Sequence, residues 1–493
     1  MNKAYEKLDR IFVAGEWRTG SGKEMHNICP WDESTIFTMK GATADDVDEA
    51  CKAAAEAQKE WGAMPPAARA AVLSRIAEVM DSRKDEIAEW IVREIGGTQV
   101  KAALEHKLCT DVARKGAVLP FMVEGLILPE DIPGKESRAY RQPAGVVALI
   151  SPWNFPLQLT GRTLLPALAL GNAVVLKPSS DSIVTGGTIF AAICEEAEVP
   201  KGLVSVLPGG GSDIGDPLIA HDIPSVVSFT GSTGVGRGVG KAALDADLIK
   251  SVELELGGNS PIVVLDDADL DYAVEASVWG KFMHQGQICM IANRIVVEDG
   301  IYDAFVEAFV ERVKKLPVGK RDAADCFIGP IVNRDQFDGI TDMIAKAKEQ
   351  GATCALGGEP DGLVIPPHVF TNVGEDNCLV DNEIFGPLCP ITRAKDEDDA
   401  IRLANATSYG LSASVFSENE GRALRVAKQI QSGMCHINDA PVNDSPMSPF
   451  GGVKNSGIGR FNGRWAIDAF TTTRWISVQH EKRQLPFSAD DLG

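Results

Sequence analysis

Short runs rich in β-branched residues, each followed by Gly or Pro and then by a helical stretch, recur from Gly145 onward and constrain the fold more than any other feature. The runs are residues 146–150, 173–176, 204–207, 226–229 and 262–265. Strands that alternate with helices in this way are typical of parallel βαβ units. We therefore expect a parallel sheet covered by helices.

The same alternation resumes further along the chain. Strand-like runs at 293–297 and 411–416 precede helical patterns at 301–315 and 421–431. Before residue 145 the chain is helix-rich, with apolar residues at helical spacing over 44–61 and 67–95, and Thr43 with Asp46 predicts a helix N-cap. The sequence predicts two successive α/β domains with a boundary near Glu255, where no linker composition marks the change.

Composition excludes several classes of function. The chain has 493 residues, a net charge of −21 and no long basic run, so we expect neither nucleic acid nor an anionic membrane as a partner. The longest apolar stretch, residues 164–176, is too short to span a bilayer, and the charged start is no signal peptide, which predicts a cytoplasmic protein. Ten cysteines without a C-x-x-C pair predict neither a metal site nor a disulfide scaffold.

Cys289 lies in a segment with a glycine shortly before it, residues 282–290 (Phe-Met-His-Gln-Gly-Gln-Ile-Cys-Met). A catalytic cysteine needs a setting that favours the thiolate, and Gly286 suggests a tight turn there. Alone, the segment fits a buried structural cysteine better. A protease-like dyad with His284 is an alternative, but a separation of five residues brings two side chains together on no regular element.

Two other segments offer the groups that a nucleophilic cysteine requires. Asn154 lies between two prolines directly after the first strand-like run, so its amide is a rigid donor at a strand end, or a group that merely satisfies loop carbonyls. Glu255 ends another predicted strand, residues 251–256, where a carboxylate is either solvated or, if burial raises its pKa, a base.

Two successive strand-to-helix turns have the layout of a phosphate cradle. Lys177 follows one strand, and residues 231–236 (Gly-Ser-Thr-Gly-Val-Gly) follow another and open a helix that reaches residue 244. The spacing is G-x-x-G-x-G, so a plain turn explains the glycines equally well. A cation beside a helix N-terminus nevertheless suits a dinucleotide. Glu383, in a loop bounded by Gly and Pro, is either a turn acid or an acceptor for ribose hydroxyls.

Taken together, these segments resemble the aldehyde dehydrogenase superfamily nearly from end to end. The motifs are 152–156 (Pro-Trp-Asn-Phe-Pro), 177–179 (Lys-Pro-Ser), 229–232 (Phe-Thr-Gly-Ser), 255–258 (Glu-Leu-Gly-Gly), 286–289 (Gly-Gln-Ile-Cys), 383–387 (Glu-Ile-Phe-Gly-Pro) and 449–457 (Pro-Phe-Gly-Gly-Val-Lys-Asn-Ser-Gly). Seven motifs in the family's order are far more specific than any one of them.

The resemblance implies a role for each motif. Cys289 is the expected nucleophile, Asn154 the side-chain donor of the oxyanion hole together with the backbone N–H of Cys289, and Glu255 the general base. The residues expected at the dinucleotide site are Lys177 and Glu383 on ribose hydroxyls, with Trp153, Gly231, Ser232, Gly257 and Phe385 along its walls. We expect attack on an aldehyde, hydride transfer and hydrolysis of a thioester to the acid, because members that acylate coenzyme A lack the glutamate at 255.

Cofactor and substrate choice depend on further positions. Ser180 stands where strictly NAD-using members commonly have a glutamate, so NAD and NADP are both expected, with no metal. Residues 158–162, 284–289, 434–438 and 475–479 resemble the branch that oxidises benzaldehyde, salicylaldehyde and vanillin, and Arg162, Ile288 and Phe450 are the expected substrate contacts. The alternatives are a semialdehyde or aliphatic substrate and, more remotely, a non-catalytic member.

The resemblance also implies an α/β fold in three parts. The expected parts are a Rossmann-like dinucleotide-binding domain (1–121 and 143–254), a catalytic α/β domain (255–460) and a β oligomerisation arm (122–142 and 470–493). We expect residues 137–142 to pair with 471–479 across a subunit boundary, in a homodimer or homotetramer.

Overall fold

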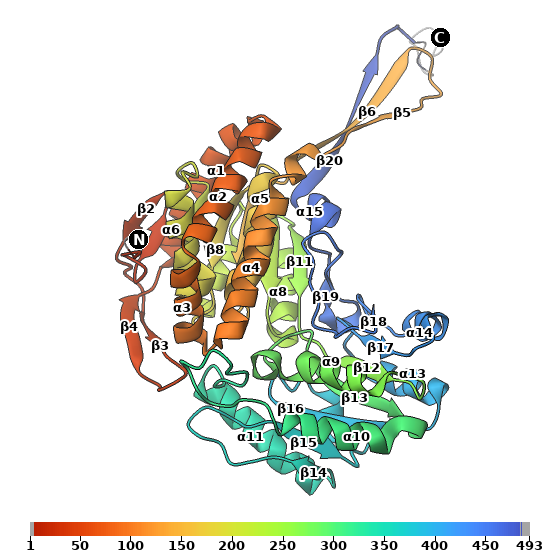
Figure 1. Ribbon diagram of the computed structural model, residues 1–493. Coiled ribbons are helices and arrows are strands. Elements are labelled where there is room, and N and C mark those ends of the chain that lie inside the picture. The colour runs from red at the N-terminus through yellow and green to blue at the C-terminus, as the bar shows by residue number, and fades with distance from the viewer. Residues whose placement is uncertain (1–3, 484, 486–493) are drawn as a thin grey trace.

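The computed structural model describes residues 4–483 and residue 485, and two sheets form the centres of its two α/β layers (Figure 1). The first sheet has the order β19-β11-β10-β7-β8-β9-β1-β2. Its parallel core comprises β7 (Val146–Ile150), β8 (Ala173–Lys177), β9 (Val204–Val206), β10 (Val226–Thr230) and β11 (Ser251–Glu255). The first four begin at the predicted residues, because each is a β-branched run buried on both faces of a parallel sheet.

Helices cover both faces of this sheet. They are α1 (Ala44–Ala63), α2 (Pro66–Ser82), α3 (Lys84–Ile95), α4 (Gln99–Gly116), α5 (Pro156–Ala169), α6 (Ile189–Glu196), α7 (Asp216–Ala220) and α8 (Thr233–Asp245). The helices α5 and α6 lie on one face with α2 to α4 outside them, and α1, α7 and α8 lie on the other. Every residue of α5 is buried, since it is enclosed between the sheet and α4.

Two details of the N-terminal helices can be compared with the sequence. The capping box at α1 is confirmed, because Thr43 Oγ1 accepts the N–H of Asp46 at 3.4 Å while Asp46 Oδ2 accepts the N–H of Thr43 at 2.7 Å. The prediction of one continuous helix over 67–95 is wrong, because the structure has two helices there. Arg83 leaves helical geometry at φ −108° and ψ 11° and divides α2 from α3. The apolar periodicity continues across this residue, so the sequence does not reveal the break.

The second sheet has the order β14-β15-β16-β13-β12-β17-β18. Its strands are β14 (Thr353–Leu356), β15 (His368–Thr371), β16 (Leu388–Ala394), β13 (Ala292–Glu298), β12 (Ser260–Val264), β17 (Ser414–Phe416) and β18 (His436–Ile437). On one face α9 (Leu270–Phe282) and α10 (Asp299–Val313) bury one apolar core, and on the other α13 (Glu397–Asn405) and α14 (Glu420–Ala427) bury a second. The parallel strands of the first sheet end at the boundary between the layers, whereas β12 and β13 of the second sheet begin there, shortly after Gly257 and Cys289.

Chain segments distant in sequence close the first layer. Two N-terminal strands, β1 (Ile11–Val13) and β2 (Glu16–Arg18), extend one edge of its sheet, and β19 (Gly457–Ile458) pairs antiparallel with β11 at the other. A separate hairpin joins β3 (Glu24–Ile28) to β4 (Thr35–Lys40), while α11 (Arg334–Glu349) and α12 (Cys378–Asp381) complete the second layer. Phe450 and Phe461 belong to the apolar core of the first layer. The division at residues 254 and 460 stays a prediction.

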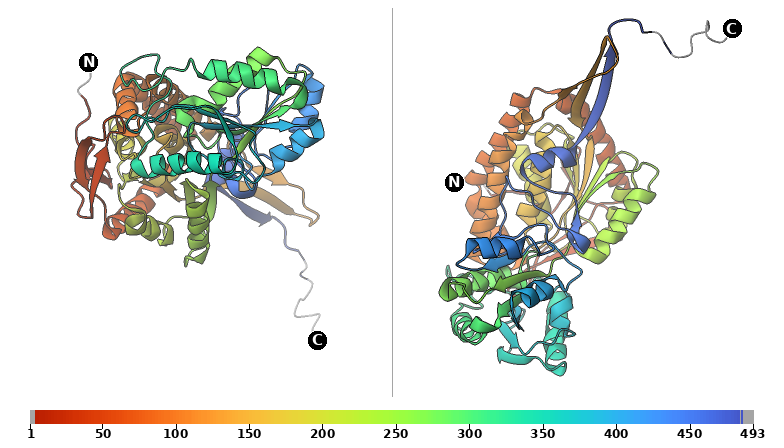
Figure 2. Two further views of the ribbon diagram at one scale, coloured as in Figure 1. Left: turned by 90° about the horizontal axis from the view of Figure 1, so that it is seen from below. Right: turned by 90° about the vertical axis from the view of Figure 1, so that its right-hand side faces the viewer.

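A three-stranded arm projects from the body (Figures 1 and 2). It consists of β5 (Leu126–Leu128), β6 (Lys135–Pro143) and β20 (Thr471–Gln479), the last of which follows α15 (Gly463–Phe470). The expected pairing across a subunit is corrected here, since β20 pairs antiparallel with β6 of the same chain from Thr471 opposite Pro143 to Gln479 opposite Lys135. The arm expected over 470–493 includes residues 484 and 486–493, which lie outside the described residues. No helix in the described ranges is both long and apolar enough to cross a bilayer.

Candidate active site

Two cavities meet at Cys289. The larger, of about 660 Å³, lies at the carboxyl ends of the first sheet's strands, and the smaller, of about 270 Å³, lies between α4, α5 and α9. Asn154, Leu159 and Cys289 line both cavities. A group in either cavity can therefore reach the thiol.

An unusual turn carries the chain from α9 to Cys289. His284, Gln285 and Gly286 have φ values of 50°, 54° and 78°, which is the left-handed region, where residues other than glycine are strained. A Cβ at Gly286 would lie 2.2 Å from the carbonyl oxygen of Gly386, so only glycine fits. Gln285 anchors the turn by donating from Nε2 to the carbonyl of Pro330 at 2.8 Å. The turn holds Cys289 between the two layers.

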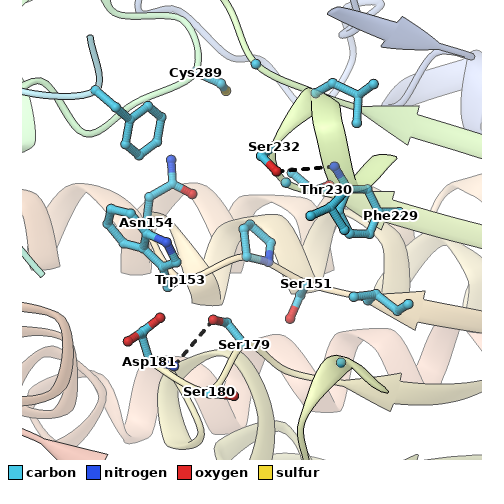
Figure 3. A pocket seen from close by; sticks show the side chains of 18 of the residues that line it. Ser151, Trp153, Asn154, Ser179, Ser180, Asp181, Phe229, Thr230, Ser232 and Cys289 are labelled. Carbon is cyan, nitrogen blue, oxygen red and sulfur yellow. Dashed lines mark hydrogen bonds between the residues drawn. The ribbon is translucent and has the colours of Figure 1, made fainter. Parts of the chain in front are cut away.

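Asn154 lies in the short loop between β7 and α5, 4% exposed. Its Nδ2 donates to the carbonyl oxygen of Gln287 at 3.0 Å, which ties this loop to the segment before Cys289. Figure 3 shows the amide pointing toward Cys289. The sequence prediction of a rigid amide at a strand end thus has a structural counterpart beside the thiol.

Glu255 ends β11 directly behind the thiol and is 1% exposed. The Sγ–H of Cys289 donates to Oε1 at 3.4 Å, and Thr230 Oγ1 donates to Oε2 at 3.4 Å. Oε2 also forms an ion pair with Arg162. Among the described residues that line the two cavities, Glu255 is missing, so its carboxylate faces the sulfur and the guanidinium rather than open space.

The pKa of the Cys289 thiol is governed by opposing effects. Burial raises this pKa to about 12, while the positive charge of Arg162 lowers it. A thiol with so high a pKa is protonated at neutral pH. Glu255, to which the thiol already donates, is therefore placed to accept its proton.

All eight residues expected at the dinucleotide site line the larger cavity: Trp153, Lys177, Ser180, Gly231, Ser232, Gly257, Glu383 and Phe385. Ser232 is the N-cap of α8, and its Oγ accepts the N–H of Val235 at 3.5 Å, so the positive end of the α8 dipole faces the cavity. The rings of Trp153 and Phe385 meet edge to face at 5.4 Å. A ligand that carries both a negatively charged group and flat rings fits these walls.

Two charged residues of this cavity, the buried Lys177 and the half-buried Glu383, have no opposite charge in hydrogen-bond contact. Lys177 donates to the carbonyl of Pro178 at 3.0 Å, and burial lowers its pKa to about 8. Glu383 accepts the N–H of Gly258 at 2.8 Å, and burial raises its pKa to about 7. Groups held in this way gain from a polar ligand such as a ribose with its hydroxyls. The residues present therefore fit a nicotinamide dinucleotide.

The three expected substrate contacts, Arg162, Ile288 and Phe450, all line the smaller cavity. Its other walls are largely apolar and come from Leu104, Leu108, Phe155, Leu159, Trp279, Met290 and Val442. Arg162 is not free, because it pairs with Glu255 and with Asp444 at 3.5 Å, and its guanidinium lies 3.9 Å from the centre of the Phe450 ring. Two carboxylates thus compensate Arg162, the one cation among the described residues that line this cavity.

Sequence reasoning missed part of this cavity. Asp444 accepts from Arg162 and from Gln158 Nε2, the latter at 3.0 Å, yet it lies in a loop with no distinguishing pattern. Leu104 and Leu108 are one helical turn apart on α4, a spacing that is typical of residues in a hydrophobic core. The dyad with His284 does not form. That ring packs edge-on against Phe155 at 5.6 Å, and the thiol bonds to Glu255 instead.

The family model of the aldehyde dehydrogenase family matches residues 17–476. The chain belongs to the aldehyde dehydrogenase family. Two similar proteins are a vanillin dehydrogenase of Corynebacterium glutamicum, 49% identical over 95% of this chain and 97% of that protein, and the benzaldehyde dehydrogenase YfmT of Bacillus subtilis, 43% identical over 98% and 99%. The predicted resemblance and an oxidoreductase acting on aldehydes are thereby confirmed.

Solved structures agree with the fold of this aldehyde dehydrogenase. A salicylaldehyde dehydrogenase from Pseudomonas putida, complexed with salicylaldehyde, superposes with a TM-score of 0.94 at 36% identity, covering 97% of this chain and 99% of that one. An NAD-dependent benzaldehyde dehydrogenase from Corynebacterium glutamicum superposes with a TM-score of 0.91 at 46% identity, covering 99% and 100%. The predicted aldehyde dehydrogenase fold is confirmed.

We predict that the cofactor-free enzyme alkylates slowly at neutral pH. The folded-state pKa of the thiol is raised, so the thiolate fraction, and with it the rate of Cys289 alkylation by iodoacetamide, should rise roughly tenfold per pH unit between about pH 7 and about pH 10. Mass analysis of the peptide 282–294 locates the label among the ten cysteines. Arg162→Met should slow the reaction at each pH. A plateau below about pH 9 contradicts the burial argument.

Proposed function

We propose that this enzyme oxidises an aromatic aldehyde of the benzaldehyde, vanillin or salicylaldehyde type to the carboxylic acid, with NAD or NADP as hydride acceptor. The observation that carries the proposal is the largely apolar cavity of about 270 Å³, which meets the larger cavity at Cys289. An aldehyde in one cavity and a nicotinamide in the other would meet at the thiol.

The first half of the reaction uses three side chains. Glu255 takes the proton of the Cys289 thiol, to which it is already hydrogen-bonded, and the sulfur attacks the aldehyde carbon. The carbonyl oxygen becomes an oxyanion that accepts hydrogen bonds from Asn154 Nδ2 and the backbone N–H of Cys289, in exchange for the present bond of the amide to Gln287. When bound, the nicotinamide accepts the hydride that leaves this carbon.

The second half releases the acid. Loss of hydride leaves an acyl group on Cys289 as a thioester. Once Glu255 has released the proton of the thiol to solvent, its carboxylate removes a proton from the water that attacks the thioester. The bond to sulfur then breaks, the acid departs and the thiolate regains a proton from Glu255. Because Glu255 is present and buried beside the sulfur, hydrolysis rather than transfer to coenzyme A is the proposed outcome.

Substrate class follows from the walls of the smaller cavity. Leu104, Leu159 and Met290 favour an apolar, flat group over a charged one. The alternative of a semialdehyde requires a cation for its carboxylate, and Arg162 is already shared between Glu255 and Asp444. Relatives that carry the names of vanillin and benzaldehyde dehydrogenases support the aromatic proposal. A non-catalytic role is disfavoured because nucleophile and base are both present.

The test is a comparison of kcat/KM for benzaldehyde, vanillin and salicylaldehyde with hexanal and succinic semialdehyde. We expect the aromatic aldehydes to exceed the other two by at least about 10-fold, the discrimination that lost apolar contacts or a buried carboxylate bring. Cys289→Ala should abolish turnover of every substrate. A preference for hexanal or succinic semialdehyde would leave the chemistry intact and refute the aromatic assignment.

Cofactor choice is proposed to include both dinucleotides. Ser180 is exposed at the cavity wall and carries no charge, so nothing at this position repels a 2′-phosphate, and the ammonium of Lys177 lies in the same cavity. Asp181, which sequence reasoning missed, also lines the cavity, and burial raises the pKa of its carboxyl, which lessens its repulsion of a phosphate.

We therefore expect measurable turnover with both cofactors under equal conditions. Ser180→Glu should lower kcat/KM for NADP about 10-fold or more by like-charge repulsion while changing that for NAD by less than about 3-fold. The matched control is Ser180→Gln, which has the size of glutamate without its charge and should keep NADP activity. Equal losses of NADP activity in both variants would show that the size of the side chain at this position, not its charge, causes the loss.

A homodimer or a dimer of dimers is proposed for the assembly. Its support is the arm, on which Ile127 is 78% and Trp475 62% exposed, an apolar surface that association would cover. A cytoplasmic location likewise stays a prediction.

A further inference from the structure

A fully buried ion pair contacts the loop that carries Asn154 and has no part in the proposed reaction. Lys101 and Glu105 face each other across one turn of α4, each with 0% exposure of its side chain. Removing two charges from water costs more than their attraction returns unless further hydrogen bonds compensate. The other contacts of the pair show where that compensation lies.

Glu105 caps a helix other than its own. Its Oε1 accepts the N–H of Leu157 at 2.8 Å and the N–H of Gln158 at 3.1 Å, the second and third residues of α5. Phe155, the N-cap of α5, provides no side-chain hydrogen bond, so this carboxylate from α4 satisfies donors that would otherwise be orphaned. Asn154 directly precedes that N-cap, and its position depends on where α5 begins.

Lys101 contacts the same loop at Phe155. Its Nζ lies 4.4 Å from the centre of the Phe155 ring, in cation–π geometry. The same ring also contacts His284, edge-on at 5.6 Å and 87°, at the start of the left-handed turn before Cys289. The ion pair therefore supports the Asn154 loop directly and the Cys289 segment through Phe155.

We propose that the Lys101–Glu105 pair positions the oxyanion hole, with Glu105 fixing the start of α5 and Lys101 holding Phe155 between the two segments that supply the hydrogen-bond donors. This inference rests on the proposed function. The two donors, Asn154 Nδ2 and the N–H of Cys289, come from segments 135 residues apart that meet in the bond from Asn154 to Gln287, which closes the same ring of contacts. Neither residue touches the substrate, so both are positioning residues.

The test separates the acceptor from the charge. In a Lys101→Met background, Glu105→Gln keeps an oxygen for the two N–H groups and removes the charge, whereas Glu105→Leu removes both. Relative to Lys101→Met alone, we expect Glu105→Gln to keep kcat within about 3-fold. Glu105→Leu should lower kcat roughly 10- to 100-fold, the effect of a displaced catalytic group, with the KM for NAD unchanged. With Lys101 retained, Glu105→Asp keeps the charge but shortens the reach, and it should show the same loss of kcat.

A matched control comes from the same helix. Lys107 and Asp111 form an equivalent pair one turn apart at 3.0 Å, but both are partly exposed. Lys107→Met with Asp111→Asn should leave kcat unchanged. Equal losses in Glu105→Gln and Glu105→Leu, or losses confined to thermal stability, overturn the proposal.

A double-mutant cycle distinguishes positioning from a general effect on the fold. Asn154→Ala alone should reduce kcat roughly 100-fold or more. In that background Glu105→Asp should cost less than about 2-fold further, because the group that it positions is gone. A full additional loss refutes the inference alone. Normal activity of Asn154→Ala refutes the oxyanion assignment of the proposed function, and the inference with it.

Discussion

The left-handed turn at His284, Gln285 and Gly286 is the constraint on which the site depends. The helix α9 ends at Phe282, Met283 leaves helical geometry with a ψ of 130°, and the turn then leads the chain to Cys289. The sulfur there lies between Asn154, from the loop after β7, and Glu255, from the end of β11. The cost of two strained residues, His284 and Gln285, is offset by anchors such as the bond from Gln285 to Pro330.

Buried charge is the second organising feature. Beside the thiol, the guanidinium of Arg162 forms ion pairs with two carboxylates, those of Glu255 and Asp444. The guanidinium lowers the pKa of a thiol whose pKa burial raises. A cavity with apolar walls and an internally compensated cation suits a neutral, flat substrate.

Much of the fold was readable from the sequence, because its central strands are β-branched runs bounded by Gly or Pro. The strands β7, β8, β9 and β10 begin at the predicted residues. The edge strands β1, β2 and β19 were not predicted, since short segments joined over hundreds of residues carry no local signal. The pairing of β20 with β6 was predicted to cross a subunit boundary, but it lies within the chain, for the same reason.

The site divides in a similar way. Motifs identified Cys289, Asn154 and Glu255, which the structure brings together, although their catalytic roles stay proposals. Asp444 and Glu105 were missed, because a carboxylate in a loop or within an amphipathic helix looks like any other until its partners are known. The ion pair of Arg162 with Glu255 joins residues 93 positions apart, so no local sequence pattern predicts it.

The measurement that tests the account most directly is a single-turnover experiment on Glu255→Gln with benzaldehyde and NAD. If Cys289 forms a thioester that Glu255 helps to hydrolyse, up to one equivalent of reduced cofactor per subunit should form before the thioester is hydrolysed, although more slowly than in the wild type because Glu255 also takes the thiol proton. Turnover should then be roughly 100-fold slower than in the wild type, and the benzoyl group should be found on Cys289 in the peptide 282–294. Rapid turnover, or an acyl group on another cysteine, would contradict the account.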